Sequence, residues 1–208
     1  MAMGSLSSWL YRMCEWITRL VYVNLLWIGF SLLGLLLFGV GPATSSMFMI
    51  IRKWVIGQED VKVFSSFWRA YKKDFWKANL LTLFLVAAGF LLYLDYKFIG
   101  NLEGWYTTIL SGLLLLLTLL YIVTLVYIFP VFVLFQLRPL QYIKYAIHFG
   151  VSSPLSMLLI ISSALFMYYL TVNIPATFPF LSGSVISIVI MKRAQKTFSK
   201  LEDKYVTS

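Results

Sequence analysis

Side chains that commonly carry out catalysis or bind metals are few in this sequence and are not clustered. The chain has one histidine, His148, one cysteine, Cys14, and eight acidic residues spread from Glu15 to Asp203. A metal site draws three or four ligands from His, Cys and carboxylates at characteristic spacing, and a nucleophile needs a base beside it. The stretch 39–46 also lacks the Gly-Lys-Ser/Thr ending that cradles nucleotide phosphates. We therefore expect no catalytic, cofactor-binding or metal-binding residues and a protein that is not an enzyme.

The elements available to position any functional residue are hydrophobic helices. Of the 208 residues, 61% are hydrophobic and 12% are charged, whereas soluble chains carry about 25% charged residues. The charge-free runs are 20–51, 78–94, 104–137 and 145–191. A helix that crosses the hydrocarbon core needs about 20 apolar residues, with about 17 as a lower limit. The sequence thus predicts an all-α, polytopic membrane helix bundle in a single domain.

These runs hold five predicted spans. The last run is divided near Pro175, because the residue before a proline is disfavoured in a helix. The fifth span is short and contains Pro179 and Gly183, so it is alternatively kinked, re-entrant or completed by packing in an oligomer. The predicted segments are an amphipathic amino-terminal helix at 1–19, transmembrane helices at 20–40, 79–96, 105–129, 154–172 and 175–191, an interfacial connection at 43–78 and a basic tail at 192–208.

Positive residues are distributed unevenly among the predicted connections. With five spans, the first connection, the third connection and the carboxyl-terminal tail share one side, which holds every Lys and Arg except Arg12, Arg19 and Lys97. Because positive residues resist translocation, we expect this side, with the carboxyl terminus, to be cytoplasmic and the amino terminus to lie outside. The helix 1–19 is amphipathic and can lie on either membrane surface, so its side stays open.

The first connection contains an aromatic stripe on a basic helix. Phe64, Phe67, Trp68, Tyr71, Phe75 and Trp76 recur at helical spacing, and Arg69, Lys72, Lys73 and Lys77 fall elsewhere on the helix. Aromatic rings and lysines favour the headgroup region of a cytoplasmic membrane surface. The pattern predicts either a membrane anchor or a docking helix for another protein. The candidate docking or interface residues are Arg52, Lys53, Trp54, Phe67, Trp68, Arg69, Tyr71, Lys72, Lys73, Phe75, Trp76 and Lys77.

Four further residues are candidates for helix packing or for a transport pathway. Gly41 and Pro42 follow the first span, and Pro42 suits the first turn of a short helix at 43–56. Such a break is either a simple corner or part of a binding cavity. Asn24 and Asn79 lie at span entrances, where a carboxamide can form hydrogen bonds between helices.

Several of these residues also resemble a known family. The runs Gly39-Val-Gly-Pro-Ala-Thr44, Arg52-Lys53-Trp54 and Phe67-Trp-Arg-Ala-Tyr-Lys-Lys-Asp-Phe-Trp-Lys-Ala-Asn79, together with Asn24, resemble the YesL-like family of bacterial integral membrane proteins. That family is known mainly as a domain of unknown function, and its genes often accompany carbohydrate-uptake transporters and polysaccharide-degrading enzymes. The resemblance implies an accessory role in sugar uptake at the bacterial cell membrane.

Two functions follow as hypotheses. The first is a non-enzymatic accessory membrane protein associated with a bacterial carbohydrate (oligosaccharide) uptake system, with carbohydrate ABC-transporter permease subunits as partners. The alternative is an autonomous small transporter or channel, formed as a homo-oligomer, whose pathway is lined by Asn24, the Gly41-Pro42 break and the polar Ser and Thr residues of the last two spans. Both place the protein in the lipid bilayer, and neither involves nucleic acid, because the aromatic residues share their stripe with a membrane-facing helix.

Overall fold

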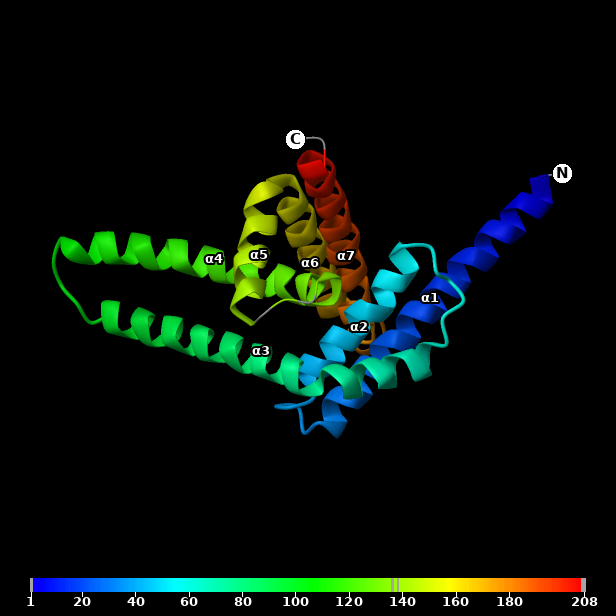
Figure 1. Ribbon diagram of the computed structural model, residues 1–208, viewed down its shortest axis with the longest axis horizontal. Coiled ribbons are helices and arrows are strands. Elements are labelled where there is room, and N and C mark those ends of the chain that lie inside the picture. Colours follow the sequence, from blue (N-terminus) through cyan, green and yellow to red (C-terminus); the bar gives the residue numbers. More distant parts are fainter. Residues whose placement is uncertain (1, 136, 138, 207–208) are drawn as a thin grey trace.

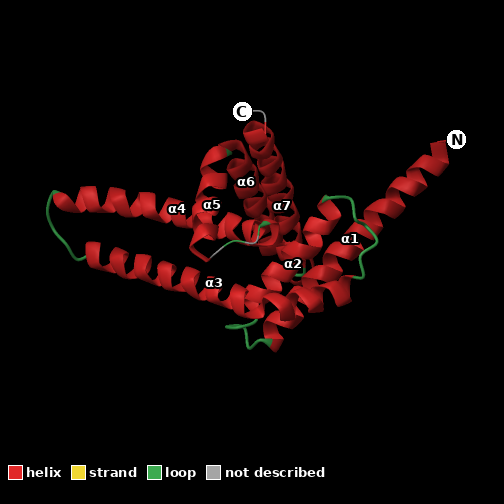
Figure 2. Ribbon diagram, in the orientation of Figure 1, coloured by secondary structure: helices red, strands yellow, loops and turns green. Residues whose placement is uncertain are grey.

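The computed structural model describes residues 2–135, 137 and 139–206, and the side chains of 9–135, 137 and 141–199. This part of the chain folds into helices without a strand, which confirms the all-α prediction (Figure 2). The helices are α1 (Ala2–Leu33), α2 (Val40–Val55), α3 (Val63–Ile99), α4 (Tyr106–Leu134), α5 (Pro139–Ser152), α6 (Pro154–Asn173) and α7 (Thr177–Val206).

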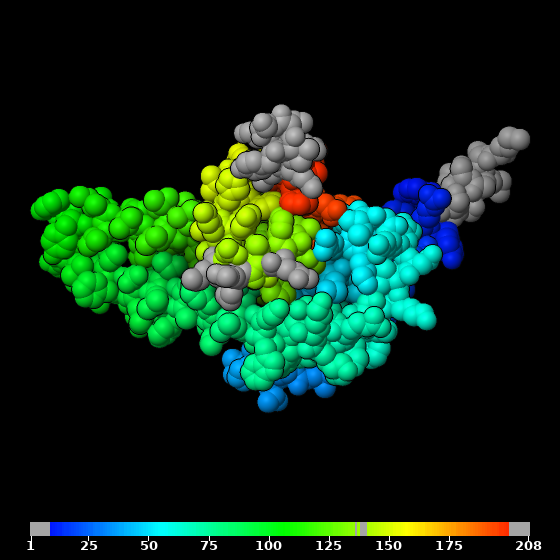
Figure 3. Space-filling view, viewed as in Figure 1, coloured from blue at the N-terminus to red at the C-terminus, as the bar shows by residue number. Residues whose placement is uncertain are grey.

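The helices pair as hairpins around α2. The chain reverses between α1 and α2, between α3 and α4, and between α6 and α7, and α2 packs against α1, α3, α4 and α7. Figure 1 shows the α3–α4 hairpin extending away from the other helices, with its loop at 100–105 as the far tip. The same hairpin forms the projection at the left of the space-filling view in Figure 3.

The chain turns after α1 earlier than the sequence predicted. The first span was expected at 20–40, but α1 ends at Leu33 and a turn occupies 34–39. In this turn Leu35 and Leu36 have φ values of 55° and 62°, a left-handed conformation that is uncommon for residues other than glycine. The sequence did not predict this turn, because its residues contain no polar side chain and continue the hydrophobic run.

Four helices are long and apolar enough to cross a membrane: the segment Trp9–Leu33 of α1, and α3, α4 and α6. Residues 177–191 of the predicted fifth span, 175–191, form the first half of α7, which over its described residues is not apolar enough to join these four helices. Residues 192–206 of the predicted basic tail are the helical continuation of α7, and 207–208 lie outside the described residues. In this continuation Ala194 and Thr197 are buried, and the Thr197 hydroxyl lies 3.0 Å from the Ser153 hydroxyl.

Helix α3 joins two segments that the sequence separated. The aromatic part of the connection and the span at 79–96 form one helix of 37 residues. Residues 63–88 contain neither glycine nor proline, so nothing in the backbone interrupts the helix where the side chains change from basic to apolar.

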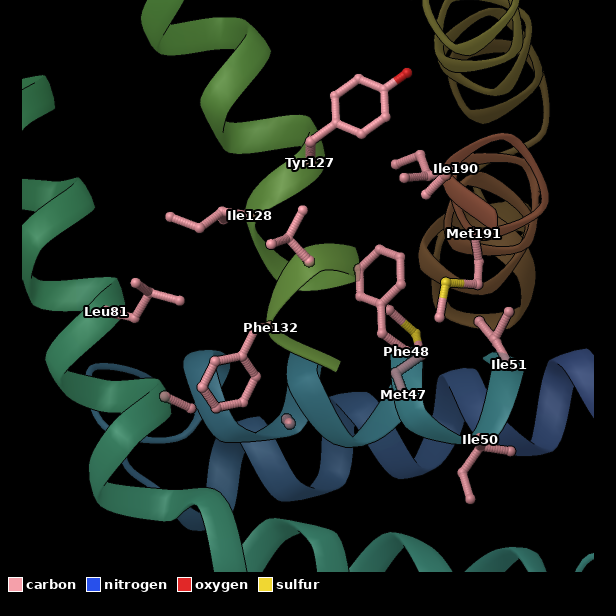
Figure 4. Packing of buried hydrophobic residues seen from close by; sticks show 14 of the residues in the cluster. Met47, Phe48, Ile50, Ile51, Leu81, Tyr127, Ile128, Phe132, Ile190 and Met191 are labelled. Carbon is pink, nitrogen blue, oxygen red and sulfur yellow. The ribbon is translucent and has the colours of Figure 1, made fainter. Parts of the chain in front are cut away.

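The core gathers around α2, which is buried and not interfacial as expected for 43–78. Met47, Phe48, Ile50 and Ile51 of α2 pack in one cluster with apolar side chains of α3, α4 and α7. Figure 4 shows Met191 of α7 pointing toward this group, and Ile128 and Phe132 of α4 on the side nearer Leu81 of α3. The apolar pattern of a short amphipathic helix is the same whether it faces lipid or protein, so the sequence did not distinguish these two environments.

Much of the remaining apolar surface faces outward. In the most hydrophobic 18-residue segment of α4, 11% of the residues are buried inside the protein, and the share is the same in that of α6. An apolar surface of this extent on an isolated chain marks contact with lipid or with another protein.

Candidate interface and helix-packing sites

Asn24 of α1 is completely buried and bridges one turn of α7 with its carboxamide. Its Nδ2 donates to the backbone carbonyl oxygens of Phe178 (3.4 Å) and Pro179 (2.8 Å). Its Oδ1 accepts from the backbone N–H groups of Gly183 and Ser184, at 3.1 Å each. A primary amide can form four hydrogen bonds, and Asn24 forms all four with one helix.

Two α7 residues explain how a side chain fits so close to a helix backbone. In a regular α-helix the N–H of residue 183 bonds to the carbonyl of residue 179, and Asn24 contacts both groups. A Cβ on Gly183 would lie 2.8 Å from the Asn24 Oδ1, so glycine is required here by the close approach. The predicted weak point of the fifth span is therefore the place where α1 holds α7.

Gly41 and Pro42 form a packing corner between α2 and α3. A Cβ on Gly41 would collide with the Thr82 Oγ1 and lie 3.0 Å from the Ala78 carbonyl oxygen. The Pro42 carbonyl accepts hydrogen bonds from nearby serine hydroxyls of α2. Pro42 lies in the first turn of α2, the helix position at which its missing N–H costs least.

Asn79 of α3 contrasts with Asn24. It is 9% exposed, and neither its Oδ1 nor its Nδ2 has a hydrogen-bond partner in the described part of the chain. A buried polar group without a partner costs about 1–3 kcal/mol. Of the two candidate asparagines, only Asn24 holds helices together by hydrogen bonds.

Part of the aromatic stripe is turned inward against α1. Phe67 and Tyr71 are buried, and their rings lie 5.1 and 5.0 Å from the ring of Phe30. The Tyr71 hydroxyl donates to the Phe30 carbonyl at 3.2 Å. These two members of the predicted docking set therefore belong to the core and are not available to a partner.

Another part of the same helix faces outward. Arg69, Lys72 and Trp76 are exposed and follow one side of α3 at positions i, i+3 and i+7. The Trp76 side chain is 82% exposed. The Lys72 Nζ lies 4.7 Å from the centre of the Trp68 ring, a cation–π contact. We call Arg69, Lys72 and Trp76 the outer face of α3. Phe75 is half-buried between the two sides. Lys73 and Lys77 are also exposed, beside the outer face, and they line a pocket with Arg52.

The three candidates at the end of α2 are anchored within the protein. The Arg52 Nη1 donates to the Val133 carbonyl of α4 at 2.8 Å, and the Lys53 Nζ lies 3.5 Å from the Ser66 hydroxyl. The buried Trp54 ring meets the edge of the Trp16 ring at 5.9 Å. These contacts tie α2 to α4, α3 and α1.

The amino-terminal helix lies beside the first connection. The Arg19 Nη1 is 3.7 Å from the Glu59 carboxylate, and Trp16 contacts Trp54. The prediction that the amino terminus lies across the membrane from this connection is thus wrong for the segment around Arg19, because α2 runs back along α1 and returns the chain to the same end.

The residue types associated with catalysis stay apart in the fold. Cys14 of α1 and His148 of α5 are both exposed. Among the described residues, His, Cys, Asp and Glu form no group of three that could hold a metal ion.

Comparisons with known proteins place the chain in a family. Residues 20–96 match the model "Protein of unknown function, DUF624". The chain is 35% identical to the uncharacterized protein YteU of Bacillus subtilis over 96% of this chain and 89% of the relative. It is 36% identical to YesV, over 94% of each chain, and 31% identical to YesL, over 96% of this chain and 94% of the relative; both are uncharacterized proteins of Bacillus subtilis. No solved structure matches the chain. With such relatives over nearly its whole length, the chain belongs to the YesL-like family of membrane proteins.

Proposed function

We propose that the protein is a non-enzymatic accessory subunit of the bacterial cell membrane that binds the permease subunits of a carbohydrate uptake system. The observation that carries the proposal is the outer face of α3, formed by Arg69, Lys72 and Trp76. This face stays exposed after the neighbouring aromatic residues Phe67 and Tyr71 have packed into the core.

The composition of this face suits a protein partner at the membrane surface. Trp and Arg are enriched in the interaction centres of protein interfaces, where a large side chain fills a pocket on the partner. Trp76 projects from a helix whose other side packs on α2. The helix backbone is therefore fixed before binding, and the loss of conformational entropy on binding a partner would be small. The link to carbohydrate uptake comes from the family resemblance and its genomic company.

The charge distribution supports a cytoplasmic location for this face. The hairpin turns at 34–39, 100–105 and 174–176 contain no Lys or Arg, whereas the connections at 56–62 and 135–138 contain Lys62 and Arg138. Arg19 contacts Glu59 of the connection 56–62, so Arg12 and Arg19 lie on the same side as these positive connections. We infer from this bias that the outer face of α3 and the carboxyl terminus are cytoplasmic.

The contacts of Asn24 weigh against the alternative of an autonomous transporter or channel. A pathway residue should offer polar atoms to a ligand or to water. Every hydrogen-bonding position of the Asn24 carboxamide is already used by α7. The Thr82 side chain occupies the space beside Gly41.

Affinity purification from mild-detergent membranes of cells grown on plant polysaccharide tests the proposal. The tagged wild-type chain should recover permease subunits in stoichiometric amounts. The double variant Arg69→Glu, Lys72→Glu should lose them, since it reverses two charges on the outer face. The matched control is Lys192→Glu, Lys196→Glu, which makes the same change in charge at exposed positions of α7 and should retain the partner.

Two results would overturn the proposal. Recovery of the wild-type chain without permease subunits would reject the accessory role. Equal recovery by both double variants would reject docking through the outer face of α3.

A further inference from the structure

Two adjoining cavities of opposite character lie where α3, α4 and α5 meet. The polar cavity, of about 660 Å³, is lined by Arg52, Lys73 and Lys77 among other residues. The apolar cavity, of about 250 Å³, is lined by Leu80, Leu81, Phe84 and Ile143 among others. They share Lys77, Phe132, Leu137 and Tyr142 as walls, so the polar space continues into the apolar one.

The polar cavity has an excess of positive charge. Among the described residues, three cationic side chains line it against one carboxylate, Asp74. In the described part of the chain, neither Lys73 nor Lys77 forms an ion pair. The Arg52 Nη1 donates to the Val133 carbonyl, but its Nε is buried and has no hydrogen-bond partner among the described residues. A buried guanidinium donor without an acceptor is costly, and an anionic oxygen in this cavity would satisfy it.

The apolar cavity follows the same side of α3 toward the bilayer core. Lys73, Lys77, Leu80, Leu81 and Phe84 stand at positions i, i+4, i+7, i+8 and i+11 of one helix. Lys77 is the last charged residue before the charge-free run 78–94. Along this side, the helix therefore changes from basic to apolar in the same order as a lipid changes from headgroup to acyl chain.

The far wall of the cavities is held in place by Tyr142 of α5. Its hydroxyl accepts from the Leu137 N–H at 3.0 Å and lies 3.4 Å from the Phe135 carbonyl oxygen. The Tyr142 ring also packs 5.3 Å from the ring of Phe132. The wall shared by the two cavities is thus fixed by contacts within the protein before any ligand binds.

We infer that these joined cavities bind an anionic phospholipid of the membrane. Its phosphate lies among Arg52, Lys73 and Lys77, and one acyl chain lies along Leu80 and Phe84. Basic pockets between membrane helices at the cytoplasmic surface are suited to phospholipid headgroups. A free anion would leave the apolar cavity unfilled, and an apolar ligand would leave the cations unpaired, whereas a phospholipid matches both.

Native mass spectrometry of the full-length protein in a neutral detergent tests the inference. The probes are phosphatidylglycerol, phosphatidylcholine with the same acyl chains, and inorganic phosphate. The wild-type chain should bind phosphatidylglycerol roughly tenfold more tightly than phosphatidylcholine. The variant Lys73→Gln, Lys77→Gln should bind phosphatidylglycerol about thirtyfold more weakly, because each lysine near an anionic lipid contributes about fivefold.

The matched control is Arg69→Gln, Lys72→Gln, which removes the same charge from exposed positions of α3 that line neither cavity. Its affinity for phosphatidylglycerol should stay within about twofold of the wild-type value.

Equal weakening by the two variants would overturn the inference, since it would indicate attraction to surface charge in general. It would also be overturned if phosphatidylcholine bound as tightly as phosphatidylglycerol, or if phosphate displaced the lipid at equal concentration. Arg69 and Lys72 line neither cavity, and a different pair of charges tests each proposal, so failure here leaves the permease proposal standing, and the reverse also holds.

Discussion

Replacing Asn24 with leucine should destabilise the protein while preserving its volume at this position. The substitution removes the four hydrogen bonds that join α1 to α7. Hydrogen bonds between helices in a membrane protein contribute about 0.6 kcal/mol each on average, so their loss should cost about 2–3 kcal/mol. For a chain of this size, 1 kcal/mol corresponds to about 2–4 °C in Tm. We therefore expect the Tm to fall by about 5–10 °C.

Thermal unfolding in detergent, followed by tryptophan fluorescence, measures this change. The matched control is Asn173→Leu, because Asn173 is exposed and its Nδ2 bonds within its own helix to the Tyr169 carbonyl. The control should shift the Tm by no more than about 2 °C. Equal shifts for the two variants, or an unchanged Tm for Asn24→Leu, would refute the assignment of Asn24 as the link between α1 and α7.

A double-mutant cycle with Gly183 makes the test specific to this contact. Gly183→Ala should destabilise the wild-type chain, because the new methyl group would lie 2.8 Å from the Asn24 Oδ1. In an Asn24→Ala background that oxygen is absent, so the same change should cost less, with a coupling energy of about 1 kcal/mol or more. Additivity within about 0.5 kcal/mol would show that the two residues do not interact.

Three further predictions concern α3 and its contact with α2, and they use the same unfolding assay. Asn79→Leu should leave the Tm unchanged or raise it, because the Asn79 carboxamide is buried and has no hydrogen-bond partner in the part of the chain that the structure describes; a clear fall would contradict this. Tyr71→Phe should cost about 1 kcal/mol through loss of the hydrogen bond to the Phe30 carbonyl, and an unchanged Tm would argue against that bond. Gly41→Ala should lower the Tm, and Thr82→Ala should restore part of the loss, since the new methyl group would meet the Thr82 hydroxyl; no restoration would place the collision elsewhere.

The sequence was informative wherever hydropathy alone determines structure. The helical class and the apolar runs that became α3, α4 and α6 could be read directly, because a spanning helix requires a long stretch without charge. The sequence was less informative where a helix continues across a change in hydropathy. Residues 63–78 are basic but contain no helix breaker, so they continue into the apolar span as one helix.

The tertiary contacts at the candidate sites could not be predicted from one sequence. Asn24 was recognised as a polar residue in a span, but its acceptors and donors lie more than 150 positions away in α7. The division of the aromatic stripe depends on Phe30, which lies in another apolar run and carries no distinctive signal. The approach of Arg52 to Val133 likewise depends on the path of the chain between α2 and α4.

Photo-cross-linking in intact cells tests the proposed docking of α3 most directly. A photoreactive phenylalanine analogue replaces Trp76, which is 82% exposed on the outer face of α3, and in a control chain it replaces Tyr168, which is 70% exposed on α6. We predict that position 76 cross-links to a carbohydrate permease subunit and that position 168 does not. Cross-links from position 76 only to lipid or to other copies of the chain would contradict the proposed docking.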